Sequence, residues 1–356
     1  MTANASRTLS PPSTRTVRRR QLAGLALGTA LLGAFLPGAA MAQEKRLTLM
    51  TYGALWERIF RPLAEDLKKD TGITLEYVSQ TSAVEGLTKL QANRDKPQAD
   101  VWFTSESVAL RAATDTKLFV PLDPVKIPNL KMLMKGAAND MFVASYYAPL
   151  GIVYRPDLVP GGKITSWNDL WQPSFKNKVS LPAPNIFPGR MILISTLLNG
   201  GDINNIQPGL EFLAKQKPNL AAIHSADAQA RRALAQGEIW AMVTSPSAVG
   251  ALRDQKIPAA MVSPKPAPLF FEGVMITRSG KEDLAAAFVN KLLSQEWQKF
   301  ITDSYNMGPV RTDVKPSAAF LEAMPKEGDG VVVDEAYINA NIGKWTDRFN
   351  EVTGGK

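Results

Sequence analysis

Beyond its N-terminal segment, the chain alternates between two hydrophobic periodicities. Residues 46–51 alternate polar and apolar side chains, which is typical of a strand with one buried face. Apolar side chains then recur every four residues, at Leu55, Ile59, Leu63 and Leu67. This spacing predicts a helix over residues 55–69 with one apolar stripe, and Gly72 is expected to cap its C-terminus. A strand followed at once by an amphipathic helix is the repeating unit of an α/β fold.

The same alternation continues along most of the chain. Further strands are predicted at residues 73–78, 99–103, 152–154, 179–181, 221–224, 239–243 and 272–277. Further helices are predicted around residues 87–90 and 105–111, from residue 165, and at residues 190–198, 209–216, 226–236 and 282–303. Because strands and helices alternate, we expect an α/β fold with mostly parallel sheets flanked by helices.

The N-terminal segment has the three parts of an export signal. Residues 1–20 contain five arginines and no acidic residue, and residues 21–43 carry no charge. The small-x-small pattern of a cleavage site follows at Ala40, Met41 and Ala42. We therefore expect residues 1–42 to be a signal peptide, cleaved after Ala42, that directs the protein to the periplasm. RRQL at residues 19–22 is twin-arginine-like, which leaves the choice between the Sec and twin-arginine routes open.

The mature protein is expected to be shorter and less positively charged than the full chain. Cleavage after Ala42 leaves 314 of the 356 residues, which suits two lobes of about 150 residues each. Five of the positive charges behind the formal net charge of +8 lie in the signal, so the mature chain carries only about +3. This balance gives no reason to expect nucleic-acid binding.

Composition narrows the possible chemistry. The chain contains no cysteine and a single histidine, His224. A disulfide, a cysteine nucleophile and a cysteine metal site are therefore excluded, and a zinc site would lack its usual cluster of ligands. The sequence also has no G-x-S-x-G, G-x-G-x-x-G or P-loop motif. We expect no catalytic residue, no metal ligand and no cofactor.

Several segments together resemble a known family. The most specific is TSWNDLW at residues 165–171, followed by FKNKV at residues 175–179. TYG at residues 51–53, ADVW at residues 99–102 and QGEIW at residues 236–240 follow the order and spacing of the same family. The chain resembles the type II periplasmic binding proteins, and among them the spermidine/putrescine-binding branch of the ABC-transporter extracellular solute-binding proteins.

The resemblance implies two lobes, each a mostly parallel sheet flanked by helices, with the ligand cleft between them. Residues 43–150 are expected to begin lobe 1, residues 151–269 to form lobe 2, and residues 270–310 to return to lobe 1. Residues 311–356 are expected to form a C-terminal helical segment. The resemblance also implies a periplasmic monomer that binds a small-molecule ligand. Its partners would be an inner-membrane ABC permease and a cytoplasmic ATPase.

Open α/β sheets bind ligands at the carboxyl ends of their strands, and this rule selects loops in both lobes. The candidate ligand-binding residues are Tyr52, Ser82, Ser105, Glu106, Tyr147, Arg190, Ser245, Ser247 and Glu272. Four of them have an alternative role that does not involve a ligand. Ser105 can serve as a helix cap and Glu106 as a solvated acid in the first turn of that helix. Tyr147 can pack in the core, and Arg190 can lie on the surface.

Glu272 and Arg190 lead to different expectations for the ligand. Polyamine-binding relatives carry an acidic residue at a position matching Glu272, so the resemblance implies that Glu272 meets an ammonium group. Arg190 at a helix start would instead suit a zwitterion, a carboxylate or a phosphonate. The sequence lacks the further acidic residues that polyamine binders carry around residues 183–185. The tyrosines of a ferric iron site are absent around residues 244–247.

The leading hypothesis is a periplasmic binding protein that captures a small polar organic solute, with a polyamine-like amine as the favoured ligand, by closure of two lobes. An exported enzyme on the same fold is the alternative class, although no nucleophile–base pair is visible in the sequence. A chemoreceptor-docking protein would use the same closure, so the sequence does not separate it from a transport protein.

Overall fold

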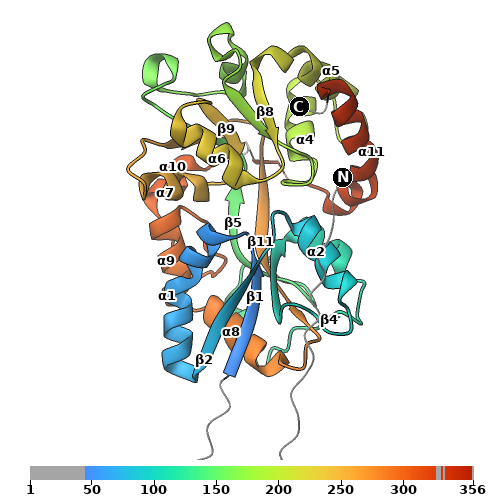
Figure 1. Ribbon diagram of the computed structural model, residues 1–356, viewed down its shortest axis with the longest axis vertical. Coiled ribbons are helices and arrows are strands. Elements are labelled where there is room, and N and C mark those ends of the chain that lie inside the picture. The colour runs from blue at the N-terminus through green and yellow to red at the C-terminus, as the bar shows by residue number, and fades with distance from the viewer. Residues whose placement is uncertain (1–44, 326–329, 332, 355–356) are drawn as a thin grey trace, which may run out of the picture. The chain divides into compact units, whose positions relative to one another are not determined.

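The computed structural model describes residues 45–325, 330–331 and 333–354. These residues form two β-sheets with helices packed against them (Figure 1). The predicted signal peptide at residues 1–42 lies outside the described residues. Within the described ranges, no helix combines the length and the apolarity needed to cross a membrane.

The first sheet begins with the strands that the alternation predicted. β1 (Lys45–Thr51) lies between β2 (Ile73–Ser79) and β3 (Val101–Ser105), and all three are parallel. A long strand, β11 (Ala267–Thr277), pairs antiparallel with β3. Three further strands pair with β11: β4 (Phe119–Val120), β5 (Val143–Pro149) and β12 (Gly330–Val331). The sheet is parallel where strand and helix alternate and antiparallel where β11 meets β3, β4 and β5.

Five helices pack around the first sheet: α1 (Ala54–Thr71), α2 (Ala83–Ala92), α3 (Glu106–Ala112), α8 (Glu282–Leu292) and α9 (Gln295–Tyr305). The predicted apolar stripe of α1 is buried, since Ile59 and Leu67 are inaccessible to solvent. Burial of each such side chain stabilises the fold by about 1.5–3 kcal/mol. Gly72 ends α1 in the left-handed conformation, with φ of 76°, which confirms the predicted cap.

The second sheet has the order β10-β6-β9-β7-β8. Its strands are β6 (Gly151–Tyr154), β7 (Val179–Pro182), β8 (Leu220–His224), β9 (Ala241–Thr244) and β10 (Ala260–Val262). Its helices are α4 (Arg190–Leu198), α5 (Gln207–Lys215), α6 (Asp227–Gln236) and α7 (Ser247–Arg253). β7 pairs parallel with β8 and β9, whereas β6 and β10 are antiparallel to their neighbours. We call the parts built on the first and second sheets lobe 1 and lobe 2.

The chain crosses between the lobes at two adjacent places. The first crossing joins β5 to β6 at Leu150, whose amide donates to the Pro268 carbonyl at 3.0 Å. The return crossing joins β10 to β11, and the Trp167 indole donates to two of its carbonyl oxygens, at 2.9 and 3.1 Å. A Cβ on Gly151 would lie 2.6 Å from a carbonyl oxygen of β10. Glycine is therefore required where the first crossing passes β10.

Two predicted helices differ from the observed ones. The helix predicted over residues 282–303 is divided into α8 and α9, because the Ser294 hydroxyl accepts from the Trp297 amide and caps a new helix. The helix predicted from residue 165 is only a 3₁₀ turn, η3 (Trp167–Trp171), which begins at a capping box. Other 3₁₀ turns are η1 (Pro128–Met132), η2 (Pro160–Gly162), η4 (Pro173–Phe175) and η5 (Lys217–Asn219).

The C-terminal segment contains two helices, α10 (Ala318–Ala323) and α11 (Glu335–Thr353). α11 packs against α5 of lobe 2 (Figure 1). It also packs against α3 of lobe 1, so one helix contacts both lobes. Its side chains Ile338 and Trp345 are buried. Gly189, just before α4, approaches this helix so closely that a Cβ there would lie 3.0 Å from the Trp345 ring.

Candidate ligand-binding site

A cavity of about 630 Å³ lies where strand ends of both lobes meet. Lobe 1 contributes residues that follow β1 and β2, among them Tyr52 and Ser82. Lobe 2 contributes residues that follow β8 and β9, among them Asp227 and Ser247, and Glu272 of β11 completes the lining. Both lobes thus use the carboxyl ends of parallel strands, where open α/β sheets bind ligands. The volume lies within the range of small-molecule sites, about 300–1,000 Å³.

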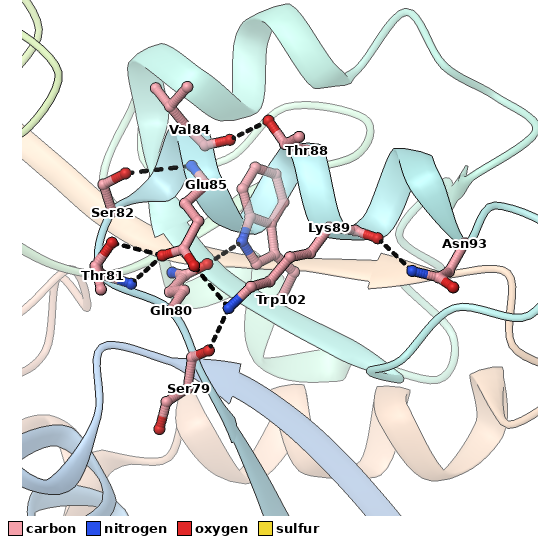
Figure 2. Close-up of polar contacts among 10 residues, drawn as sticks. All are labelled: Ser79, Gln80, Thr81, Ser82, Val84, Glu85, Thr88, Lys89, Asn93 and Trp102. Atoms are coloured by element: carbon pink, nitrogen blue, oxygen red, sulfur yellow. Dashed lines mark hydrogen bonds and ion pairs between the residues drawn. The ribbon is translucent and has the colours of Figure 1, made fainter.

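The corner between β2 and α2 contributes Ser79, Thr81 and Ser82 to the cavity lining. Figure 2 shows the polar contacts of this corner. The Ser82 hydroxyl caps α2 by accepting from the Glu85 amide at 3.2 Å. The Glu85 carboxylate accepts from the amide and the hydroxyl of Thr81, each at 2.5 Å, and pairs with Lys89 at 2.7 Å. The hydrogen bond from Lys89 and those from Thr81 lower the pKa of Glu85 to about 2. The corner is therefore held together by its own charges.

Gln80 fixes this corner to the sheet below it (Figure 2). Its side-chain amide donates to the Phe103 carbonyl at 2.7 Å and accepts from the Trp102 indole at 2.8 Å. A Cβ on Gly86 would lie 1.7 Å from the Gln80 side-chain oxygen, so glycine is required where α2 passes over it. A buried amide with its hydrogen bonds satisfied leaves the loop little freedom.

Glu272 is a buried acid in the cavity wall. It is 9 % exposed, and the Tyr146 hydroxyl donates to it at 2.5 Å. Burial raises the pKa of Glu272 to about 7, while the hydrogen bond from Tyr146 opposes the shift and the charge of Asp227 adds to it. Within the described chain, no lysine or arginine forms an ion pair with Glu272. The protein itself therefore does not neutralise the charged form of this acid.

Aromatic rings surround this acid. Tyr146 stacks on Trp56 with ring centres 5.6 Å apart, and Trp56 lies 4.5 Å from Phe103. Tyr52 meets Phe103 edge-on at 5.7 Å, and both Tyr52 and Trp56 line the cavity. Burial and the Glu272 charge hold the pKa of Tyr52 well above its usual value, so its hydroxyl stays protonated. Aromatic side chains beside a carboxylate form a surrounding that suits a cation.

Lobe 2 brings charged side chains of both signs to the cavity from α6. Asp227 accepts from the Thr244 hydroxyl and pairs with Arg231 at 2.7 Å. Arg232 also lines the cavity and is exposed. The hydroxyls of Ser245 and Ser247 lie 2.7 Å apart where β9 leads into α7. This wall therefore offers guanidinium and hydroxyl donors together with one carboxylate.

The single histidine is not among the lining residues. His224 on β8 contacts the Ser180 hydroxyl at 2.9 Å, and burial lowers its pKa to about 4, so its ring is neutral at pH 7. Among the described residues, no three His, Cys, Asp or Glu side chains are grouped so as to hold a metal ion. The lining of the cavity offers charges and hydrogen bonds for binding.

Residues 62–326 match a family model described as bacterial extracellular solute-binding protein. The chain belongs to this family. It is 27 % identical over 279 residues to spermidine/putrescine-binding periplasmic protein 1 of Haemophilus influenzae, covering 74 % of each chain. It is 26 % identical over 280 residues to a Salmonella typhimurium periplasmic protein named for 2-aminoethylphosphonate binding, covering 74 % of this chain and 77 % of that one.

A solved structure agrees with this family assignment. The crystal structure of an ABC transporter from Clostridium perfringens ATCC 13124 is 28 % identical to the chain. It matches with a TM-score of 0.63 over 86 % of this chain and 99 % of that one. The two-lobed α/β fold expected from the sequence is thereby confirmed.

In this solute-binding protein, the structure places the predicted ligand residues in two groups. Those that line the cavity are Tyr52, Ser82, Ser245, Ser247 and Glu272. Those that do not line it are Ser105, Glu106, Tyr147 and Arg190. Ser105 ends β3 and makes no capping hydrogen bond, and its hydroxyl lies 3.4 Å from that of Ser107. Tyr147 packs edge-on against Phe320 at 5.3 Å.

Arg190 and Glu106 belong to a second group of charges. Arg190 is 2 % exposed and forms an ion pair with Glu335 of α11. Burial and the charge of Glu335 raise the pKa of Glu106 to about 7, and Arg190 opposes the shift. The Asn339 side chain of α11 donates to the Ser107 carbonyl of α3 at 2.7 Å. We call Arg190, Glu335 and Glu106 the α11 cluster.

Four charged residues of the cavity wall were not predicted from the sequence: Lys89, Asp227, Arg231 and Arg232. Asp227 could have been predicted, because the rule that ligands bind at the carboxyl ends of strands selects the loop after the predicted strand 221–224. Arg231 and Arg232 lie farther along α6, where the rule gives no guidance.

Proposed function

We propose that this solute-binding protein captures a small solute with an ammonium group, placed against Glu272 and Asp227, for import by an ABC transporter. The supporting observation is Glu272, a buried carboxylate in the cavity wall that no basic side chain of the described residues neutralises. A buried charge without a partner costs several kcal/mol, so a ligand cation is stabilised at such a place. Asp227 adds a second negative charge to the same surroundings.

The relatives and the aromatic rings support an amine. The relatives are named for spermidine, putrescine and 2-aminoethylphosphonate, and each of these compounds has a primary ammonium group at neutral pH. Tyr52 and Trp56 are aromatic residues of the cavity lining. An ammonium group within about 6 Å of a ring centre is attracted to it. The polyamine-like amine favoured by the sequence therefore remains a candidate.

We infer that ligand binding closes the two lobes about the crossings between them. The cavity is lined from both lobes, so closure would remove a bound solute from water. The predicted boundary at residues 150/151 is supported by β5 ending at Pro149 and β6 beginning at Gly151. β11 begins at Ala267, three residues before the predicted boundary at residues 269/270. Small-angle scattering should show a smaller radius with saturating ligand. An unchanged radius would contradict closure.

We also propose that the mature protein begins at Gln43, acts in the periplasm as a monomer, and delivers its ligand to a membrane permease served by a cytoplasmic ATPase. The arginine-rich start and the small residues before Gln43 support cleavage there. N-terminal sequencing and light scattering of the exported protein test both points. A membrane-retained chain with an uncleaved N-terminus would contradict the first, and a stable dimer the second.

Thermal unfolding with a solute panel tests the ligand class. Putrescine, spermidine and 2-aminoethylphosphonate are each added to the mature protein, and a true ligand present at 100 times its Kd should stabilise it by about 2.7 kcal/mol. Chromatography of the recovered solute separates binding from catalysis, because an exported enzyme would return a changed compound. Absence of stabilisation by every amine of the panel would contradict the proposed function.

A further inference from the structure

The charged residues of the cavity wall are not all partnered within the protein. Lys89 is paired inside α2, and Arg231 is paired with Asp227. Arg232 lines the cavity but has no ion-pair or hydrogen-bond partner among the described residues. Glu272 accepts a hydrogen bond from Tyr146 but has no basic partner among the described residues. Two charges of opposite sign, Glu272 and Arg232, are thus left for a ligand to meet.

The hydroxyl groups of the cavity add hydrogen-bond donors. The Ser245 and Ser247 hydroxyls lie 2.7 Å apart, so one donates to the other and one proton remains for a further acceptor. The Ser82 hydroxyl accepts from the Glu85 amide, and its own proton has no acceptor within the described residues. All three serines are buried. A ligand that satisfies these donors needs acceptor atoms, which an alkylammonium group lacks.

We infer that the solute is a zwitterion: an amine that also carries a phosphonate or carboxylate group, bound by Arg232 and the cavity hydroxyls. The inference rests on the proposed function, which supplies the ammonium end at Glu272. A guanidinium group matches the planar, multi-acceptor geometry of such anions. A diamine would instead bring its second ammonium group toward Arg232, since Lys89 and Arg231 are already paired with acids, and like charges disfavour that arrangement.

Calorimetry with three probes tests the inference: 2-aminoethylphosphonate, 3-aminopropanoate and putrescine. The proteins are the wild type, Arg232→Ala and a matched control, Lys176→Ala. Lys176 is an exposed lobe 2 residue outside the cavity lining, so its replacement removes the same charge without touching the site. The wild type should bind at least one zwitterion about tenfold or more tightly than putrescine. The stronger of the two zwitterions identifies the anionic group.

The variants should separate the two ends of the ligand. Arg232→Ala should weaken zwitterion binding by about 10- to 100-fold and leave putrescine binding unchanged or tighter, whereas Lys176→Ala should change neither. The inference is overturned if putrescine binds as tightly as the zwitterions, if neither zwitterion binds, or if Arg232→Ala behaves like Lys176→Ala. The proposed function fails in a different way, when Glu272→Gln leaves the affinity for every amine unchanged.

Discussion

The cavity and the α11 cluster each contain a carboxyl group whose pKa burial raises to about 7, Glu272 in one and Glu106 in the other. The α11 cluster contains its own cation: Arg190 pairs with Glu335, and its charge also acts on Glu106. At the cavity, no basic side chain of the described chain pairs with Glu272. A raised pKa is therefore common to both acids, and the presence or absence of an internal cation is what separates their surroundings.

The surroundings of the two regions agree with this distinction. The α11 cluster lies where one helix is packed against both lobes, and Arg190 is almost inaccessible to solvent. Glu272 is similarly buried, but it lines a cavity of about 630 Å³ together with aromatic and hydroxyl-bearing residues. One region thus lies in a packed interface between helices, and the other borders a cavity.

Removal of the internal cation should disrupt the α11 cluster. Arg190→Ala leaves Glu335, whose side chain is 11 % exposed, without its partner, and we expect the free energy of unfolding to fall by about 3–5 kcal/mol. Urea unfolding measures the loss. Lys299→Ala, which removes one member of an exposed pair with Asp303, should cost less than about 1 kcal/mol. Equal losses in both variants would show that the Arg190 pair is no different from a surface pair.

Removal of the cavity acid should affect binding and spare folding. Glu272→Gln should weaken binding of the cognate amine by about 2–5 kcal/mol, because the ligand ammonium loses its buried counter-charge. Its free energy of unfolding should be unchanged or higher, since an unpaired buried charge is removed. Calorimetry and urea unfolding are also carried out on Glu322→Gln, a matched change at an exposed acid of α10 outside the cavity lining. A fall in stability as large as the fall in affinity would contradict a ligand-binding role.

Both acids should make folding stability depend on pH in the same direction. Each has a folded-state pKa of about 7 against an ordinary value of 4.5, so the folded protein holds the proton more tightly than the unfolded chain. The stabilisation that each acid gives the folded protein by binding its proton is fully present below pH 4.5 and is lost as the pH rises through 7. For Glu272 this loss in the free energy of unfolding is about 3 kcal/mol. The difference in unfolding free energy between wild type and Glu272→Gln, followed across this window, measures it. A constant difference would show that Glu272 does not titrate there.

Ligand binding at Glu272 should have the opposite pH dependence. The acid must lose its proton to meet an ammonium group, so the affinity of an amine should rise about tenfold between about pH 6 and 8. Glu272→Gln should remove this rise, while Glu106→Gln in the α11 cluster should leave it in place. The Glu272→Gln curve also corrects for titration of the ligand itself. A rise that persists in Glu272→Gln would exclude Glu272 as its source.

The sequence predicted most of the fold because its signals are local. The four-residue recurrence from Leu55 to Leu67 and the cap at Gly72 both lie within one helix, and both were found. The break at Ser294 was missed because Leu292 and Leu293 carry the apolar pattern up to it, and only the hydroxyl cap reveals the new helix.

The site was predictable only where chain position fixes spatial position. Tyr52 and Ser82 follow strands whose carboxyl ends meet at one sheet edge, so the strand-end rule found them. Arg190 has its partner 145 residues away, in a helix whose packing no local pattern reveals. Arg232 lies on α6, and periodicity does not say whether an exposed helical arginine faces water or a cavity.

The most direct test of the ammonium site is a thermodynamic cycle that removes the ammonium group of the ligand and the carboxylate of Glu272, first singly and then together. Calorimetry at about pH 8, where the acid is ionised, compares 2-aminoethylphosphonate with ethylphosphonate on the wild type and Glu272→Gln. If the ammonium group meets Glu272, removing either one weakens binding and the two losses overlap. Ethylphosphonate should then bind both proteins equally, within about twofold. If the two losses instead add in full, the ammonium group lies elsewhere, and the account of Glu272 is contradicted.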